Sequence, residues 1–180
     1  MVVGECKTSE ERLEAEANER FYIMKGAQVD GDHALMEEQA RWLIEYDPSN
    51  GYSYVWLGHA LAHQTRFEEA LAAYELALAN RLERDDPNVW ESWHHEDLGR
   101  LYTKWGKPEK AAEAYRRVAE LAPGYVEERL KEAQRWEQEG QFQLALDEIE
   151  LARMAGGTPD EEFVKSLEEK LAERSPASEG

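Results

Sequence analysis

Residues 54–79 read YVWLGHALAHQTRFEEALAAYELALA, and residues 95–123 read HEDLGRLYTKWGKPEKAAEAYRRVAELAP. In both stretches a Leu-Gly pair is followed, at matching distances, by an alanine and then a tyrosine. The similarity continues at a fixed period, because Gly106 and Gly140 lie 34 residues apart. Self-similarity at this period is typical of a helical solenoid, in which each helix pair needs its neighbour to bury its apolar face.

The matching positions follow the pattern W-x2-L-G-x2-Y…A-x3-F…P. They are Leu57, Gly58, Leu61, Phe67, Ala70, Tyr74 and Ala77 in the first stretch, and Leu98, Gly99, Tyr102, Gly106, Ala111, Tyr115 and Pro123 in the second. The chain therefore resembles the tetratricopeptide repeat (TPR) family. This resemblance implies an all-α, right-handed TPR helical solenoid. The flanking repeats match loosely, with Lys25-Gly26 and Glu132-Ala133 near the expected Leu-Gly positions.

The pattern predicts a single TPR domain over residues 9–174, between disordered tails at 1–8 and 175–180. We expect four helix-pair repeats, at about 9–50, 51–86, 87–123 and 124–158. A C-terminal capping helix follows at 159–174, with Thr158 as its N-cap and Pro159 in its first position. The expected helices cover 10–25, 32–46, 52–64, 66–81, 88–105, 108–121, 125–139, 141–155 and 159–174.

One connection is longer than the period allows. The Leu-Gly pairs that end at Gly58 and Gly99 are 41 residues apart, seven more than 34. We therefore expect the first helix of the third repeat to begin early, at Pro87, and to carry Trp90 and Trp93 on an added turn. Either the second repeat's lengthened last helix buries these tryptophans, or a bound protein does.

The first helices of TPR repeats line a concave face, and here that face is predicted to be aromatic. The helix at 52–64 is apolar on two sides, whereas its own repeat needs only one. Aromatic residues and arginine are typical of binding hot spots. The candidate partner-binding residues are Phe21, Tyr22, Lys25, Tyr52, Val55, Trp56, His59, His63, Trp90, Trp93, Asp97 and Arg100.

Composition limits the function classes. The net charge is −18, with acidic residues spread along the chain, so a phosphate backbone or an anionic membrane surface would be repelled. Long apolar runs are absent, which predicts no membrane insertion. The only cysteine is Cys6, so a reducing, cytoplasmic setting is expected.

Catalytic motifs are not found, and neither a cofactor nor a metal is expected. The run from His94 to Asp97 places neighbouring side chains about 100° apart on a helix, so they cannot converge. His59 and His63 are four residues apart, a spacing that metal ligands use, and Asp97 is a conceivable third ligand. A metal-binding enzyme through these histidines is a remote alternative.

The expected function is that of a protein-protein interaction module, an adaptor, scaffold or chaperone-like protein. Its partner would be an apolar helix or extended segment of another protein, held in the concave groove. The competing hypothesis is a structural self-assembling protein, a homo-oligomer whose groove meets another copy of the chain. A clamp for a partner's C-terminal carboxylate is not expected, because Glu96 and Asp97 lie where such members carry cations.

Overall fold

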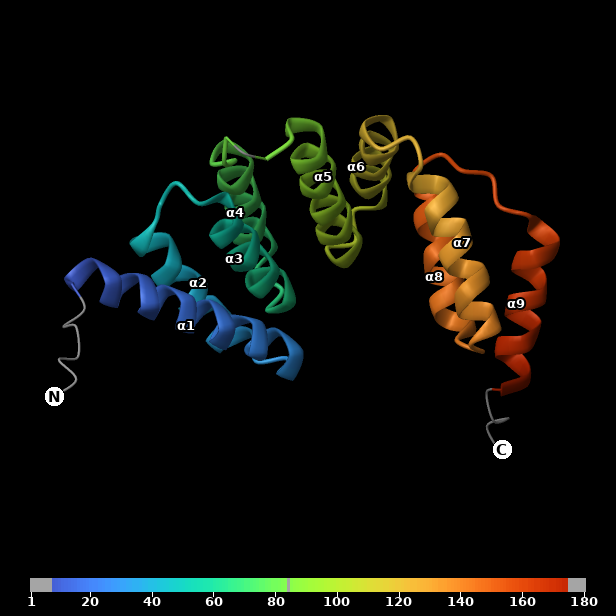
Figure 1. The fold of residues 1–180 in the computed structure, drawn as a ribbon. Helices are drawn as coiled ribbons and strands as arrows, with labels where there is room; N and C mark the ends of the chain where they lie inside the picture. Colours follow the sequence, from blue (N-terminus) through green and yellow to red (C-terminus); the bar gives the residue numbers. More distant parts are fainter. Residues whose placement is uncertain (1–7, 84, 175–180) are drawn as a thin grey trace, which may run out of the picture. The chain divides into compact units, whose positions relative to one another are not determined.

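The computed structural model describes residues 8–83 and 85–174, and these residues contain nine α-helices and no strand (Figure 1). The predicted tails, 1–8 and 175–180, lie outside the described residues except for Thr8. The helices are α1 Ser9–Asp30, α2 His33–Tyr46, α3 Gly51–His63, α4 Phe67–Ala79, α5 Pro87–Lys104, α6 Pro108–Leu121, α7 Tyr125–Gln138, α8 Phe142–Met154 and α9 Glu161–Arg174.

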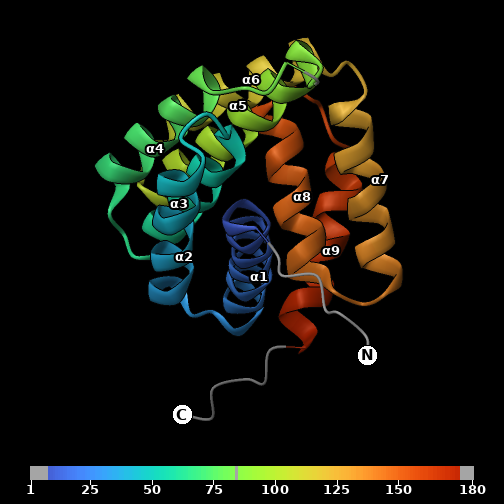
Figure 2. The same cartoon turned by 60° about the vertical axis from the view of Figure 1, so that its left-hand side comes forward.

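The chain divides into two compact units, Met1–Pro87 and Asn88–Gly180. In the first unit α1 packs on α2, α2 on α3 and α3 on α4 (Figure 1). In the second unit α6 contacts α7 and α8, and α7, α8 and α9 lie side by side (Figure 2). The division falls at the long connection that interrupts the 34-residue period. The single domain expected over residues 9–174 stays a prediction.

The turn within each described helix pair has the same backbone geometry. Gly31, Thr65, Gly106 and Gly140 all adopt the left-handed conformation, with φ between 61° and 73°. In each turn the next residue donates its backbone N–H to a carbonyl five residues back, as in a Schellman motif. The turn residues are 34, 41 and 34 apart, so they follow the register of the Leu-Gly pairs. The turn, rather than a Leu-Gly pair, therefore marks the register of the first repeat.

The glycine of each Leu-Gly pair makes room for a tyrosine ring. A Cβ on Gly58 would lie 2.5 Å from Cε1 of Tyr74, and one on Gly99 would lie 2.7 Å from Cζ of Tyr115. Both distances are far below van der Waals contact, so the two glycines permit the close approach of the paired helices. Because Tyr74 and Tyr115 are almost fully buried, these contacts form part of the core.

In the flanking repeats, residues of other sizes occupy the positions of this glycine and this tyrosine. In the fourth repeat Ala133 and Ile149 take the places of the glycine and the tyrosine, and both are buried. In the first repeat the 34-residue spacing gives Met24 and Ala40, which are also buried. The counterpart of the Leu-Gly pair in the first repeat is therefore Ile23-Met24, two residues before Lys25-Gly26. A large residue at one position accompanies a small one at the other, which conserves the packed volume.

Helix α9 covers the apolar edge of the fourth repeat. Val164 and Leu167 are buried in one cluster with Ala133 and Ile149, and Phe163 packs against it. The expected cap of this helix is corrected. Helix α9 begins at Glu161, and Asp160 Oδ1 accepts the backbone N–H of Glu162 at 2.9 Å, so Asp160 takes the place expected for Thr158.

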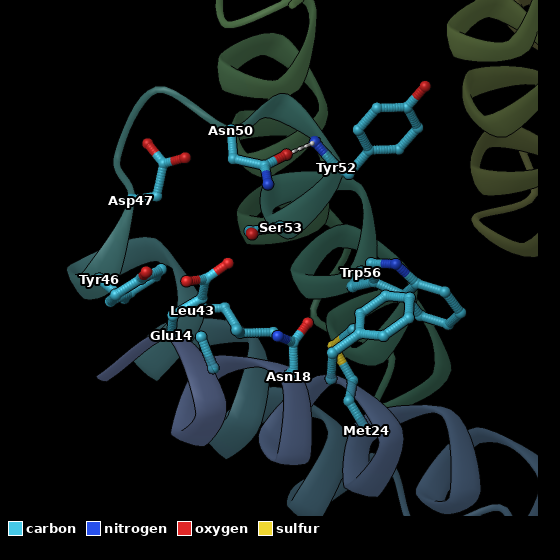
Figure 3. Close-up of a pocket in the computed structure, with 12 residues that line it drawn as sticks. Glu14, Asn18, Met24, Leu43, Tyr46, Asp47, Asn50, Tyr52, Ser53 and Trp56 are labelled. Atoms are coloured by element: carbon cyan, nitrogen blue, oxygen red, sulfur yellow. Dashed lines mark hydrogen bonds between the residues drawn. The ribbon is translucent and has the colours of Figure 1, made fainter. Parts of the chain in front are cut away.

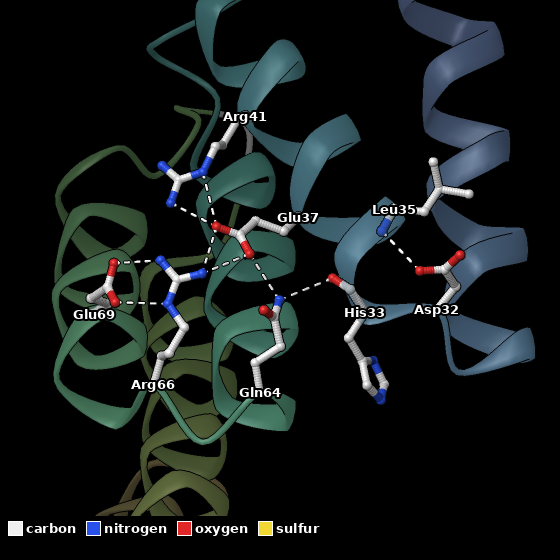
Figure 4. Close-up of polar contacts among 8 residues, drawn as sticks. All are labelled: Asp32, His33, Leu35, Glu37, Arg41, Gln64, Arg66 and Glu69. Atoms are coloured by element: carbon white, nitrogen blue, oxygen red, sulfur yellow. Dashed lines mark hydrogen bonds and ion pairs between the residues drawn. The ribbon is translucent and has the colours of Figure 1, made fainter.

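A polar network joins the first repeat to the second within the first unit (Figure 4). Glu37 on α2 accepts hydrogen bonds from Arg41, Gln64 and Arg66, at 2.8 to 3.1 Å. Arg66 also donates to Glu69. Burial acts to raise the pKa of Glu37, but the hydrogen bonds from these three side chains outweigh it and lower the pKa. The network fixes the turn at Thr65 against α2.

Candidate functional site

A pocket of about 630 Å³ lies in the first unit, where α1, the end of α2 and the start of α3 meet (Figure 3). This volume falls within the range of ligand pockets. Buried Ala17, Met24 and Leu43 give it an apolar surface. Its lining residues are Glu14, Ala17, Asn18, Phe21, Met24, Leu43, Tyr46, Asp47, Asn50, Tyr52, Ser53 and Trp56.

Two aromatic rings form one wall of the pocket. Phe21 on α1 meets Trp56 on α3 edge to face, with ring centroids 6.4 Å apart and an interplanar angle of 87°. Trp56 also contacts His59, whose ring lies 5.8 Å from that of buried Tyr74. This series of rings ties the wall to the packed interior of the second repeat. Because Phe21 and Trp56 are only half-buried, part of each ring remains available to a ligand.

Several polar residues of the pocket lie in or beside the loop between α2 and α3. Asn50 caps α3 by accepting the backbone N–H of Tyr52 at 3.1 Å. Asp47 Oδ1 accepts two hydrogen bonds from Ser49, which hold the carboxylate in place. The hydroxyl of Tyr52 donates to Asp85 at 3.3 Å. The pocket therefore combines an apolar part with a fixed polar part.

The structure brings together three of the site residues expected in the first unit, since Phe21, Tyr52 and Trp56 all line the pocket. Tyr22 is 70% exposed on α1, and the Nζ of Lys25 lies 5.7 Å from the Phe21 ring centroid. Neither these two residues nor the remaining three line the pocket. Val55 is half-buried, His59 lies between Trp56 and Tyr74, and His63 stacks on His33 at 4.2 Å between ring centroids.

The other four expected site residues belong to the second unit. Trp90 is buried, at 4% exposure, and so offers no surface to a partner in this structure. Trp93 is 53% exposed. Asp97 is half-buried, and exposed Arg100 pairs with Glu96 at 2.8 Å. Trp93 is therefore the tryptophan of the added turn that a partner can contact.

Most of the α1 side of the pocket was not predicted from the sequence. Glu14, Ala17, Phe21 and Met24 recur at helical spacing and share one face of α1. Of this face, Phe21 alone was among the expected site residues. The helical spacing from Glu14 to Met24, within the helix expected over 10–25, could have indicated the longer face.

Potential metal-ligating side chains do not gather in the described part of the chain. Residues 8–83 and 85–174 contain no group of three or more histidine, cysteine, aspartate or glutamate side chains that could hold a metal ion. The imidazoles of His59 and His63 both take part in ring contacts. Among the same residues, no helix is both long enough and apolar enough to cross a membrane.

The comparisons with known proteins agree with the repeat geometry. Residues 51–123 match the tetratricopeptide repeat family, so the resemblance read from the second and third repeats is confirmed over this stretch. Two solved structures, both of MamA, match with a TM-score of 0.53 and 20% identity. The matches cover 91% and 95% of this chain, and 86% and 85% of the two MamA chains. The predicted fold class, an all-α TPR-type solenoid, is confirmed.

Two curated relatives are distant. The general transcriptional corepressor ssn6 of Schizosaccharomyces pombe is 29% identical over 91 residues, which are 51% of this chain and 8% of the relative. The chloroplastic PsbB mRNA maturation factor Mbb1 of Chlamydomonas reinhardtii is 29% identical over 117 residues, which are 64% of this chain and 15% of the relative. The chain thus spans a small part of both. What the family supports is a protein-protein interaction module, of a kind that is generally not enzymatic.

Proposed function

We propose that this chain is an adaptor, scaffold or chaperone-like protein that holds an apolar helix or extended segment of a partner in the pocket between α1 and α3. The observation that carries the proposal is the half-open Phe21–Trp56 pair over a pocket of about 630 Å³. Rings in such a setting are typical binding anchors, because they bury a large area and lose little conformational freedom.

The wider groove remains part of the proposal. Tyr22 and Lys25 on α1, and Val55, His59 and His63 on α3, would extend the contact of the bound segment beyond the pocket. In the second unit, Trp93, Asp97 and Arg100 would form a further contact surface. The single cysteine of the chain keeps the cytoplasm as the proposed compartment.

Selection of displayed peptides tests this function. The full chain is immobilised, and 12-residue peptides are selected from a random library displayed on phage. We expect families of peptides that carry bulky apolar residues and that lose binding when Trp56 is changed to alanine. A buried aromatic anchor usually contributes roughly 2 kcal/mol or more, so the affinity should fall at least about thirtyfold.

Two controls complete the test. Trp93→Ala removes an exposed tryptophan from the second unit and should change peptide affinity less than Trp56→Ala does. Tyr74→Ala removes a ring of the packed interior and should lower the melting temperature far more than Trp56→Ala does. If Trp56→Ala unfolds the protein as severely as Tyr74→Ala, the ring is part of the core and the proposal fails.

Self-association is the competing outcome, and sedimentation velocity at several protein concentrations detects it. A dimer that dissociates in the Trp56→Ala variant, together with no selected peptides, would show that the pocket receives another copy of the chain. A monomer that binds peptides through Trp56 supports the proposed function.

A further inference from the structure

The charged side chains that line the α1–α3 pocket are of one sign. Among the described residues that line it, the charged side chains are Glu14 and Asp47, both acidic. The first unit as a whole has eight lysines and arginines against eighteen aspartates and glutamates. The field in the pocket therefore favours a positively charged group, and the low-dielectric apolar wall strengthens that preference.

The arginines on the neighbouring helix faces are committed to other contacts. Arg20 pairs with Glu16 at 2.9 Å, and its guanidinium lies 4.5 Å from the Trp42 ring centroid. Arg41 and Arg66 both pair with Glu37. These arginines are held outside the pocket, and Glu14 and Asp47 are the charged side chains that line it.

The acidic side chains and the aromatic rings lie at different ends of the pocket. In the view of Figure 3, Asp47, Tyr46 and Glu14 stand on one side, and Trp56 stands on the other beside Met24. Hydrogen bonds from Ser49 fix the Asp47 carboxylate, and the edge-to-face contact fixes the Phe21 and Trp56 rings. A ligand that satisfies both ends must carry a cation and an apolar side chain a short distance apart.

We infer that the pocket selects partner segments in which a basic residue, preferably arginine, stands next to a bulky apolar residue. This inference rests on the proposed function and specifies its partner. The apolar side chain packs against Phe21 and Trp56, and the cation lies near Glu14 and Asp47. Arginine is favoured over lysine because its planar guanidinium stacks on aromatic rings and bonds two carboxylate oxygens at once.

The experiment compares the peptides selected by two chains. The wild-type chain should select peptides that pair arginine or lysine with a bulky apolar residue. The Glu14→Gln/Asp47→Asn variant should still select apolar peptides but lose the basic residue, since the amides keep the shape of the pocket. A matched control, Glu19→Gln/Glu45→Gln, removes one acid from α1 and one from the end of α2, just before Asp47, at positions that do not line the pocket.

The coupling between the pocket carboxylates and the basic residue of the peptide is then measured from the affinity of one selected peptide. Loss of both pocket carboxylates should weaken the wild-type peptide roughly fivefold to tenfold, in the range of partly exposed ion pairs. Replacing the peptide arginine with glutamine should weaken binding to the wild-type chain similarly, but should have little further effect on the variant. The control variant should bind within about twofold of wild type, and added salt should weaken only the complexes that keep both charges.

The outcomes separate this inference from the proposed function. Apolar peptides that depend on Trp56 but show no preference for a basic residue would overturn the inference and leave the function standing. Equal loss of affinity in the pocket and control variants would also overturn it, because general charge would then explain the preference. If no selected peptide depends on Trp56, both fail.

Discussion

The second repeat, α3–α4, and the third repeat, α5–α6, pack alike but present different surfaces. In each, a glycine lets a tyrosine ring approach the first helix, at Gly58 and Gly99. The pocket beside α3 is lined by aromatic rings, with acidic residues as its charges. The pocket between α5 and α6, of about 590 Å³, is lined by three basic and two acidic residues instead. Its charged residues are Lys110, Glu113, Arg116, Arg117 and Glu120.

This difference shows which positions a repeat constrains. A buried ring requires a matching space on the facing helix, so the glycine and the tyrosine recur together. The positions that line a pocket have no such requirement, and they vary from repeat to repeat. Ligand preference in this chain therefore depends on the residues that depart from the period, whereas stability depends on those that follow it.

Removing α9 should give the largest effect. A chain that ends at Gly157 loses Phe163, Val164 and Leu167 from the apolar cluster of the fourth repeat. Burial of three such side chains stabilises by roughly 4 kcal/mol or more. Hydrogen exchange measured by mass spectrometry should show loss of protection in α7 and α8, while amides of α1–α4 keep theirs. Equal loss of protection in α1–α4 would mean that the two units unfold together.

The glycine–tyrosine contacts should give the next largest effect, and it should be the same in both repeats. Gly58→Ala and Gly99→Ala each place a Cβ less than 3 Å from a ring carbon. The clash should destabilise by about 1–3 kcal/mol, although alanine is the better helix former. Urea denaturation measures the change. An unchanged or higher midpoint in either variant would show that the ring moves aside without cost.

A double variant sharpens this test. Gly58→Ala combined with Tyr74→Ile copies into the second repeat the pair that the fourth repeat buries as Ala133 and Ile149. The two changes should be less destabilising together than the sum of their separate effects, by about 1 kcal/mol or more. Strict additivity would contradict the size compensation inferred between these positions.

The sequence predicted the fold wherever the repeat keeps its usual residues. The helix at Pro108–Leu121 has the expected bounds, and the early start of α5 at Pro87 is confirmed. The first repeat matches the residue pattern only loosely, because Met24 and Ala40 reverse the usual sizes of the two packing positions. The 34-residue spacing nevertheless pairs Ile23 with Leu57, and the left-handed turn at Gly31 keeps the same register.

The candidate site was predicted in part. The surplus apolar side of the helix at 52–64 pointed to Tyr52 and Trp56, which line the pocket, because an apolar face that its repeat does not need stands out in one helix. Asp47 was not found, since it lies in a loop whose path depends on how α2 and α3 pack. The sequence also could not show that Trp90 is buried and Trp93 exposed, because both lie on the same added turn.

Acid should weaken the second unit at a higher pH than the first. Burial lowers the pKa of His94, on α5, from 6.5 to about 4, because the interior disfavours the imidazolium. Between these values the unfolded chain binds a proton that the folded chain does not, so stability falls as the pH drops from about 6.5 to about 4. In the first unit the lowered pKa of Glu37 gives stability that is lost only as the pH falls below about 4.5.

The loss linked to His94 should amount to about 1–3 kcal/mol. Hydrogen exchange at pH values from 7 to 4, corrected for the intrinsic exchange rate, should show α5 and α6 opening before α1–α4. The His94→Gln variant, which cannot take up the proton, should flatten the dependence in the second unit. A dependence that the substitution leaves unchanged would assign the titration to other groups, such as His95, whose pKa burial also lowers.

The smallest expected effect lies in the turns, where the second repeat departs from the others. Thr65 has a φ of 61°, in a conformation that glycine adopts at Gly31, Gly106 and Gly140. A β-branched residue in this region is strained by roughly 1–2 kcal/mol, part of which glycine's greater freedom in the unfolded chain offsets. Thr65→Gly should therefore stabilise the protein by about 0.5–1 kcal/mol, and Gly106→Thr should destabilise it by about 1 kcal/mol. Urea denaturation of both variants measures the changes. Thr65→Ala serves as the control, since it removes the branch but keeps the left-handed strain, and it should gain less than Thr65→Gly. If Thr65→Gly destabilises the chain, then the threonine side chain itself holds the turn against α2, and the second repeat depends on a contact that the other three turns lack.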